Sequence, residues 1–251
     1  MNIVTKVKDW REIKKNLEEK SIGFVPTMGN LHEGHGSLFK RAKAENEIVV
    51  ASIFVNPTQF NQNNDFIHYP RTLEQDILFL KSHSVDYLFL PDVHEIYPDD
   101  YQLQMTENML SLELEGEHRP GHFNGMLTVV LKLFNIIQAG RAYFGEKDYQ
   151  QLLLVEKMVR ALFLTVQIVP CETVRAEDSL ALSSRNSRLN ASQRLQAAHF
   201  PRLLQSKLSC IEVSDELKKL GFKVDYIVEK WQRRLGAVWL DDIRLIDNFS
   251  L

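Results

Sequence analysis

The 251-residue sequence has few cysteines, no long apolar run and no strong excess of either charge. Cys171 and Cys210 are too few for a disulfide scaffold and are not spaced as a CxxC pair, which is typical of a reducing compartment. No apolar stretch approaches the ~20 residues of a membrane span, and the start MNIVTKVKDWREIKK has no signal-peptide core. We therefore expect an intracellular, cytoplasmic protein with no membrane partner.

The balance of charge argues against another class of protein. The 30 Lys and Arg residues nearly balance 33 Asp and Glu residues, which leaves a formal net charge of -3. Nucleic-acid binders usually carry a basic footprint, so we expect no nucleic-acid partner. Any anionic ligand must be held by local groups instead.

Apolar runs and helical patterns alternate along the first two thirds of the sequence. Strands are expected at 21–25, 47–55, 85–90, 141–144 and 165–169, with Pro26 ending the first. Helices are expected at 9–20, 35–46, 73–82, 125–138 and 149–163, and a loop-rich stretch at 96–122. This alternation predicts an α/β fold with a Rossmann-like, doubly wound parallel sheet.

The pattern changes after Pro170. Residues 173–190 are polar and rich in hydroxyl groups, as in a loop or hinge. Helices at 191–209 and 214–220 and strands near 222–229 and 237–246 would follow. We predict a main domain at 1–173 and a smaller C-terminal α+β domain at 174–251.

The stretch VPTMGNLHEGH, residues 25–35, follows the first expected strand. Gly29 would let the backbone approach a ligand, Gly34 would permit an awkward dihedral, and the next helix would offer free N–H groups to an anion. His32 and His35 would share one face of a first helical turn and could donate to phosphate oxygens. Taken alone, these residues support two interpretations about equally: a phosphate-binding site, or a turn in which the histidines serve only as caps. A zinc site is a weaker alternative because HxxH lacks a third ligand.

Polar stretches also follow two further strands, at the edge of a parallel sheet where ligands collect. In FGEKDYQQ, residues 144–151, Lys147 supplies a cation for a polyphosphate and Asp148 suits a helix cap or a ribose hydroxyl. Gln150 and Gln151 could hold a carboxylate or hydroxyl. In FVNPTQF, Asn56, Thr58 and Gln59 lie just past the second strand. Each stretch alone is also compatible with a polar turn or a solvated helix start.

The stretch LSSRN, residues 182–186, lies in the polar segment after the sheet. Two hydroxyls and the Arg185 guanidinium suit a loop that closes over phosphates. An ordinary interdomain linker explains the same residues about as well.

The stretches PTMGNLHEGH, FVNPTQF, FGEKDYQQ and ALSSRN, in this order, resemble the pantoate–β-alanine ligase family. YPRT at 69–72, GHFNG at 121–125, VVLKLFNIIQ at 129–138 and RLIDN at 244–248 extend the resemblance along nearly the whole chain. That family belongs to the nucleotidyltransferase superfamily, which also includes the class I aminoacyl-tRNA synthetases and binds ATP with a histidine motif. The resemblance implies a nucleotide- and pantoate-binding domain at 1–173, a lid at 174–251 and a homodimer.

The resemblance also implies a reaction in the pathway to coenzyme A. The pantoate carboxylate attacks the α-phosphorus of ATP, giving pantoyl adenylate and pyrophosphate, and the amine of β-alanine then expels AMP to form pantothenate. ATP would act as a substrate with Mg2+, whose protein ligand we do not assign. Both steps place negative charge on phosphate oxygens, so positioned donors should supply most of the catalysis.

The site residues that the resemblance implies fall into three groups. The catalytic groups are His32, His35, Lys147 and Arg185, with His35 at the position of the usual proton donor. The ATP-binding residues are Met28, Gly29, His32, His35, Gly145, Glu146, Lys147, Asp148, Val174, Leu182, Ser183, Ser184 and Arg185. The pantoate- and β-alanine-binding residues are Asn56, Gln59, Tyr69 and Gln151, with Arg119 and His122 as neighbours.

Three features depart from the family pattern. Ser179 and Asp241 stand where the family often has glycine. The stretch between about Ala191 and Gly221 is expected to be some 30 residues shorter than usual, which bears on the lid.

Three rival functions fit parts of the sequence. A related adenylyl- or cytidylyltransferase would act on a phosphorylated small molecule, which the two glutamines Gln59 and Gln151 suit less well. A nucleotide-binding regulatory module would bind ATP without turnover, and a metal hydrolase would need zinc.

Overall fold

The computed structural model describes residues 1–60, 66–67 and 69–251, which form two compact units. The first unit comprises Met1–Leu31, His35–Gly145 and Gln150–Cys171. The second comprises His32–Gly34, Glu146–Tyr149 and Glu172–Leu251, so two short loops belong with the C-terminal part of the chain. Within the described ranges, no helix is both long and apolar enough to cross a membrane.

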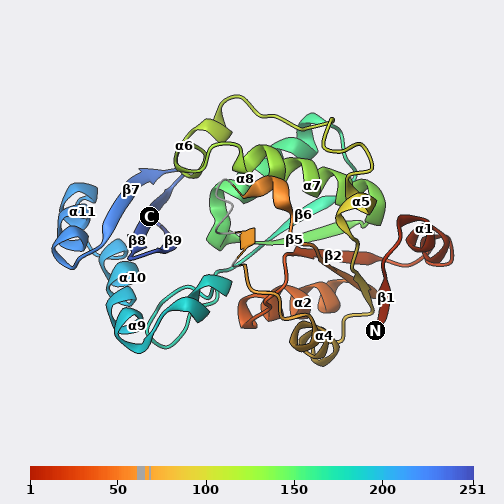
Figure 1. Cartoon of the computed structure of the whole chain (residues 1–251), viewed down its shortest axis with the longest axis horizontal. Helices are drawn as coiled ribbons and strands as arrows, with labels where there is room; N and C mark the ends of the chain where they lie inside the picture. The colour runs from red at the N-terminus through yellow and green to blue at the C-terminus, as the bar shows by residue number, and fades with distance from the viewer. Residues whose placement is uncertain (61–65, 68) are drawn as a thin grey trace. The chain divides into compact units, whose positions relative to one another are not determined.

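The first unit is built on a six-stranded parallel sheet (Figure 1). Its strands, from one edge to the other, are β1 (Asn2–Val4), β4 (Tyr87–Phe89), β3 (Ile48–Ile53), β2 (Ile22–Thr27), β5 (Arg141–Gly145) and β6 (Gln167–Cys171). The chain runs outward from β2 through β3 and β4, and then returns to the other side of β2 as β5. The sheet confirms the predicted doubly wound fold and places its topological switch point between β2 and β5, where such sheets bind ligands.

Helices cover both faces of this sheet in Figure 1, with α2 and α4 on one face and α7 and α8 on the other. The longer helices are α1 (Val7–Lys15), α2 (Glu33–Glu45), α4 (Leu73–Ser82), α7 (His122–Ile137) and α8 (Tyr149–Ala161). The shorter ones are η1 (Pro57–Gln59), α5 (Val93–Ile96), η2 (Leu110–Leu112) and α6 (Glu115–His118). A further short helix, η3 (Glu146–Asp148), follows β5 and belongs to the second unit.

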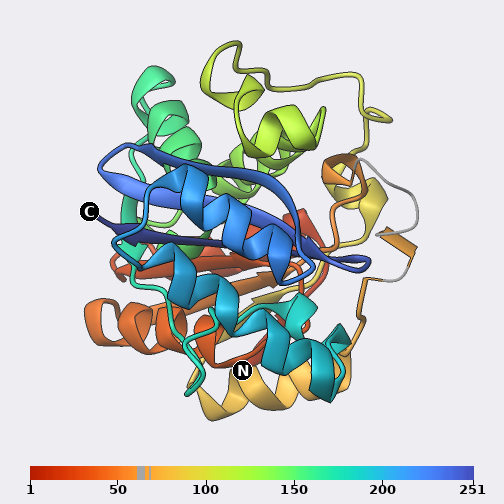
Figure 2. The ribbon, with the colours of Figure 1, turned by 90° about the vertical axis from the view of Figure 1, so that its left-hand side faces the viewer.

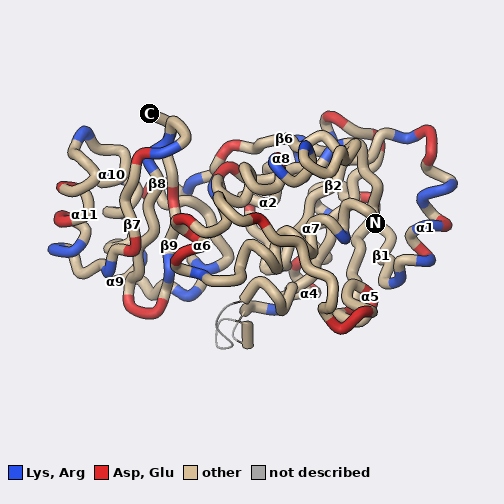
Figure 3. The backbone as a smooth tube through the Cα atoms, turned by 90° about the horizontal axis from the view of Figure 1, so that it is seen from above, with Lys and Arg blue, Asp and Glu red and all other residues tan. Residues whose placement is uncertain are grey.

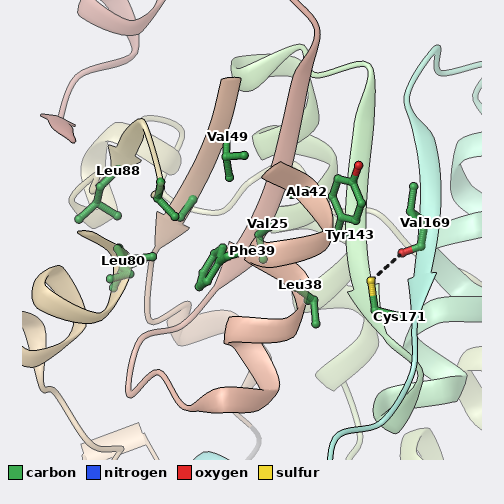
Figure 4. Close-up of a cluster of buried hydrophobic side chains, with 13 residues drawn as sticks. Val25, Leu38, Phe39, Ala42, Val49, Leu80, Leu88, Tyr143, Val169 and Cys171 are labelled. Carbon is green, nitrogen blue, oxygen red and sulfur yellow. Dashed lines mark hydrogen bonds between the residues drawn. The ribbon is translucent and has the colours of Figure 1, made fainter. Parts of the chain in front are cut away.

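Apolar side chains of α2 and α4 form one core with the sheet (Figure 4). Phe39 of α2 and Leu80 of α4 pack with Val25 of β2 and Val49 of β3, and all four side chains are fully buried. At about 25 cal/mol per Å2 of apolar surface, burial of this cluster supplies much of the force that holds the helices to the sheet.

The second unit contains a three-stranded antiparallel sheet of β7 (Lys223–Lys230), β8 (Arg233–Leu240) and β9 (Ile243–Ser250). Its helices are η4 (Ser184–Arg188), α9 (Ala191–Ala197), α10 (His199–Leu204) and α11 (Cys210–Lys219), the cyan-to-blue helices of Figure 2. Phe200 of α10, Leu217 of α11 and Val238 of β8 are central to its separate core. This arrangement confirms the predicted small α+β part.

Two predictions about single elements in the C-terminal part were wrong. The expected helix at 191–209 is broken into α9 and α10, because Pro201 has no N–H to bond to the carbonyl of Ala197. The expected strand at 237–246 is a hairpin, in which Leu240 of β8 pairs with Ile243 of β9. The two-residue turn between them includes Asp241 with a positive φ, as tight hairpin turns require.

Two strand predictions in the first unit also need correction. β2 continues through Pro26 to Thr27. β5 pairs with β2 only at Gly23 and Phe24, so the missing N–H of Pro26 costs no hydrogen bond on that side. The sequence analysis missed β1, a three-residue edge strand.

Acidic and basic residues are interspersed along the helices (Figure 3). In α1, Asp9 lies in the first turn and Lys14 and Lys15 in the last, an order that complements the helix dipole.

Candidate active site

A buried carboxylate shapes the loop that follows β2. Asp76 of α4, only 3% exposed, accepts hydrogen bonds from the backbone N–H groups of Asn30 at 3.0 Å and Leu31 at 2.8 Å. Gly29 has φ +80°, and a Cβ there would lie 3.0 Å from an Asp76 carboxylate oxygen. Asp76 was not among the predicted site residues, because its only signal in the sequence was an acidic residue in an expected helix.

His32 lies one residue before α2, while His35 lies inside its first turn. The N–H of Gly34 donates to His32 Nδ1 at 3.1 Å, so Nδ1 caps the turn and the proton of the neutral ring is on Nε2. Burial, assisted by the charge of Lys147, lowers the pKa of His32 to about 4. At neutral pH His32 is therefore an uncharged donor through Nε2.

The η3 turn carries Lys147, whose side chain is 18% exposed. The carboxylate of Glu146 forms an ion pair with Arg233 at 2.5 Å. The side chain of Asn248 donates to the carbonyls of Glu146 and Lys147. Neither Arg233 nor Asn248 was among the predicted site residues, although Asn248 ends the family stretch RLIDN.

The LSSRN segment is held by local hydrogen bonds. Ser183 Oγ accepts from the N–H of Arg185 at 3.2 Å, which caps the η4 turn. The N–H of Leu182 donates to the carbonyl of Val174 at 2.9 Å. The segment thus presents Ser184 and Arg185 from a defined turn.

Buried polar side chains gather after β3 in the first unit. Asn56, 1% exposed, donates to the carbonyl of Gly125 at 3.1 Å and to Gln59 Oε1 at 3.2 Å. Gln59 Nε2 in turn donates to the sulfur of Met28 at 3.0 Å. The structure therefore brings together three of the predicted residues, Met28, Asn56 and Gln59. A Cβ on Gly125 would lie 2.3 Å from the carbonyl oxygen of Thr58, so only glycine lets α7 approach η1 so closely.

The two predicted neighbours, Arg119 and His122, are connected to the backbone of Gln59 by hydrogen bonds. His122 Nδ1 lies 2.8 Å from the carbonyl oxygen of Gln59, and His122 Nε2 lies 3.1 Å from an Arg119 nitrogen. Because a guanidinium can only donate, Nε2 accepts and the Nδ1 proton bonds to Gln59. Tyr69, 7% exposed, packs edge-on against Phe60 in the same unit.

The suggestion that Gln150 holds a substrate group was wrong. Its amide accepts from the N–H of Glu115 at 3.1 Å and donates to the carbonyls of Leu110 at 2.7 Å and Glu113 at 2.8 Å. Gln150 is 3% exposed, so it supports the loop before α7. Gln151, its half-buried neighbour, points in another direction from the helix.

The predicted residues divide between the two units. His32, Lys147, Ser184 and Arg185, assigned to phosphates, belong to the second unit, whereas Asn56, Gln59, Tyr69 and Gln151, assigned to the organic substrates, belong to the first. His35, Met28, Gly29 and Gly145 also belong to the first. Among the described residues, no three His, Cys, Asp or Glu side chains are grouped to hold a metal ion.

Comparison with known proteins identifies the relatives of this chain. Residues 2–250 match the sequence model of the family described as pantoate-beta-alanine ligase. A pantothenate synthetase of Legionella pneumophila (strain Corby) is 50% identical over 252 residues, covering 100% of both chains. A pantothenate synthetase of Coxiella burnetii (strain Dugway 5J108-111) is 49% identical, covering 98% of this chain and 95% of that protein.

Solved structures agree with these matches. The pantoate-beta-alanine ligase of Francisella tularensis, complexed with beta-gamma ATP and beta-alanine, has a TM-score of 0.96 and 43% identity, and the match covers 100% of this chain and 97% of that one. The pantothenate synthetase of Thermus thermophilus has a TM-score of 0.91 and 41% identity, with 100% of this chain and 99% of that one covered.

The parallel sheet, the polar groups after its central strands and these relatives define an enzyme of the ligase class. The chain belongs to the pantoate–β-alanine ligase family, over nearly its whole length. The Legionella relative is matched along its full length with 252 aligned positions, so its C-terminal part has about the same length as that of this chain.

Proposed function

We propose that this chain joins pantoate to β-alanine through a pantoyl adenylate, with release of pyrophosphate and then AMP. The observation that carries the proposal is the family match over residues 2–250. The Francisella relative complexed with beta-gamma ATP and beta-alanine, which matches the whole of this chain, supports ATP and β-alanine as substrates.

In this reaction, the second unit supplies the donors for the polyphosphate. His32 donates through Nε2–H, Lys147 and Arg185 neutralise charge on the β and γ phosphates and the departing pyrophosphate, and Ser183 and Ser184 donate hydrogen bonds to them. Such donors act best when the protein fixes them beforehand, because no reorganisation is then needed as charge develops. ATP would be used together with Mg2+, which would offset part of the phosphate charge.

The first unit supplies the groups for the organic substrates. Gln59 and Gln151 bind pantoate, with Asn56 and Tyr69 beside them, and Gln59 also lies near the β-alanine position. Neutral amides suit an uncharged hydroxyl tail, because they both donate and accept hydrogen bonds. His35 donates to the α-phosphate while the pantoate carboxylate attacks.

The nucleoside lies along backbone near Met28, Gly29, Gly145 and Glu146, with Asp148 at the ribose and Val174 and Leu182 nearby. Residues 174–251 act as a lid that keeps water from the adenylate. We also propose that the enzyme is a cytoplasmic homodimer.

Exchange of labelled pyrophosphate into ATP tests the first step. Exchange should require pantoate, should not require β-alanine, and should fail with other small acids. The His35→Ala variant should exchange about 10²-fold more slowly, as expected for the loss of a transition-state donor. Gln151→Ala should raise the KM for pantoate while ATP binding survives.

Other outcomes would point to the rival functions. Tight ATP binding without any exchange would indicate a regulatory module, and exchange that needs a phosphorylated acceptor would indicate a related nucleotidyltransferase. An unchanged rate in His35→Ala would remove that residue from the mechanism.

A further inference from the structure

The turn that carries Lys147 is held by a side chain about a hundred residues away. We propose that Asn248 is a positioning residue, which fixes this turn and thereby sets how tightly the site holds the ATP phosphates. The inference rests on the proposed function, because that function assigns Lys147 to those phosphates.

The contacts of Asn248 settle the orientation of its amide. The residue lies on β9 and is 3% exposed. Its Nδ2 donates to the carbonyl of Glu146 at 2.9 Å and to that of Lys147 at 3.0 Å, while its Oδ1 accepts from Arg233 at 2.8 Å. A guanidinium has no acceptor, so the oxygen must face Arg233 and both amide hydrogens must face the turn.

Arg233 holds the same turn from β8. One of its nitrogens pairs with the Glu146 carboxylate at 2.5 Å, and its guanidinium carbon lies 4.3 Å from the ring centroid of Tyr149. Arg233 therefore contacts the residues on both sides of Lys147 and also orients the Asn248 amide.

The strand that carries Asn248 is itself fixed at this point. Asp247, 3% exposed, binds the Arg175 guanidinium through two hydrogen bonds of 2.7 and 2.9 Å. Arg175 also donates to the backbone carbonyl of Asn248 at 3.2 Å. Bidentate pairs of this kind fix the relative orientation of the two side chains as well as their distance. The backbone of β9 at Asn248 is therefore held in place.

The position of Lys147 depends on this support. Lys147 and His32 both belong to the second unit, and the charge of Lys147 contributes to the lowered pKa of the His32 ring. If the carbonyls of Glu146 and Lys147 lost their donor, the turn would relax and the ammonium group would move relative to His32. A displacement of about 1 Å is enough to cost up to about 10²-fold in a positioned site.

The Asn248→Asp variant tests this role with little change in side-chain volume. It replaces the amide donor with an oxygen that faces two carbonyl oxygens. We expect the KM for ATP in pyrophosphate exchange to rise about 10-fold or more, and the KM for pantoate to stay within about 2-fold. Asn135→Asp is the matched control, because Asn135 lies on the exposed side of α7 and its side chain donates to the carbonyl of Leu131 one turn earlier. It should change neither constant.

An unchanged ATP affinity in folded Asn248→Asp, or an equal rise in both KM values, would overturn the proposal. If that variant does not fold, Arg233→Gln replaces it with the same expected split between the two constants. Calorimetric titration with ATP alone separates this proposal from the proposed function. A wild-type chain without pantoate-dependent exchange would refute that function, whereas the loss of ATP binding in Asn248→Asp would still support the positioning role.

Discussion

At the scale of single residues, His32 combines a structural and a chemical role. Its Nδ1 caps the start of α2, and its other nitrogen remains a donor, so the two interpretations of the histidine-bearing turn are compatible. The low pKa keeps the ring neutral in the free enzyme. Binding of a polyphosphate would stabilise the charged form and raise that pKa.

The lowered pKa of His32 predicts a loss of stability in acid. Between pH 6.5 and about 4 the unfolded chain protonates this histidine and the folded chain does not, so the free energy of unfolding falls as the pH falls. The loss should reach about 2–3 kcal/mol. His32→Asn keeps an acceptor for the N–H of Gly34 and does not titrate. Denaturant unfolding should show wild type losing stability relative to this variant below pH 6.5, with a constant difference between pH 7.5 and 8.5. A constant difference down to pH 4 would contradict the assignment.

Two residues at positions where the family resemblance led us to expect glycine lie in the left-handed region of the backbone. Ser179 has φ +72° and Asp241 has φ +52°. A side chain in this conformation costs about 1 kcal/mol, and Asp tolerates it better than most residues. The structure thus explains why glycine suits both positions.

Glycine substitutions at these positions should differ in their effect. Ser179→Gly should stabilise the chain by about 0.5 kcal/mol, because relief of strain exceeds the added freedom of the unfolded chain. Asp241→Gly should gain less, because Asp241 also accepts a hydrogen bond from Gln193 at 2.6 Å. Thermal unfolding of both variants beside wild type measures this order. A larger gain at Asp241, or a loss at Ser179, would contradict it.

At the scale of elements, periodicity predicted most strands and helices, and its failures have local causes. The prediction of one helix at 191–209 did not take account of Pro201. The prediction of one strand at 237–246 did not recognise the turn at Asp241, which interrupts an otherwise apolar pattern. The helix at 73–82 was predicted with its correct bounds. Its buried Asp76 was not recognised, because its function depends on backbone groups 45 and 46 residues earlier in the chain.

The same limit applies to the supports of the candidate site. The strand expected at 237–246 stopped short of Asn248, and no local signal shows that the partner of this residue lies 101 residues earlier. A sequence pattern singles out charged residues in polar stretches, such as Lys147 and Arg185. It does not find the uncharged, buried groups that orient them, because burial and pairing are tertiary properties.

At the scale of the whole molecule, the residues proposed to bind phosphate and those proposed to bind pantoate belong to different units. The proposed phosphate donors other than His35 belong to the unit with the antiparallel sheet, and the proposed pantoate ligands belong to the unit with the parallel sheet. The proposed reaction uses both sets of residues, and the family model matches residues 2–250, which include both units. The family assignment therefore concerns the whole chain rather than a separable nucleotide-binding part.

The pantoyl adenylate is the central claim, and an oxygen label follows it directly. Pantoate with 18O in its carboxylate would be incubated with ATP, Mg2+, β-alanine and the enzyme, and the nucleotide product examined by mass spectrometry. Attack of the carboxylate on the α-phosphorus places one labelled oxygen on the AMP that β-alanine later expels. We predict AMP carrying one 18O atom in amounts equal to the pantothenate formed. Unlabelled AMP, or ADP as the nucleotide product, would contradict the account.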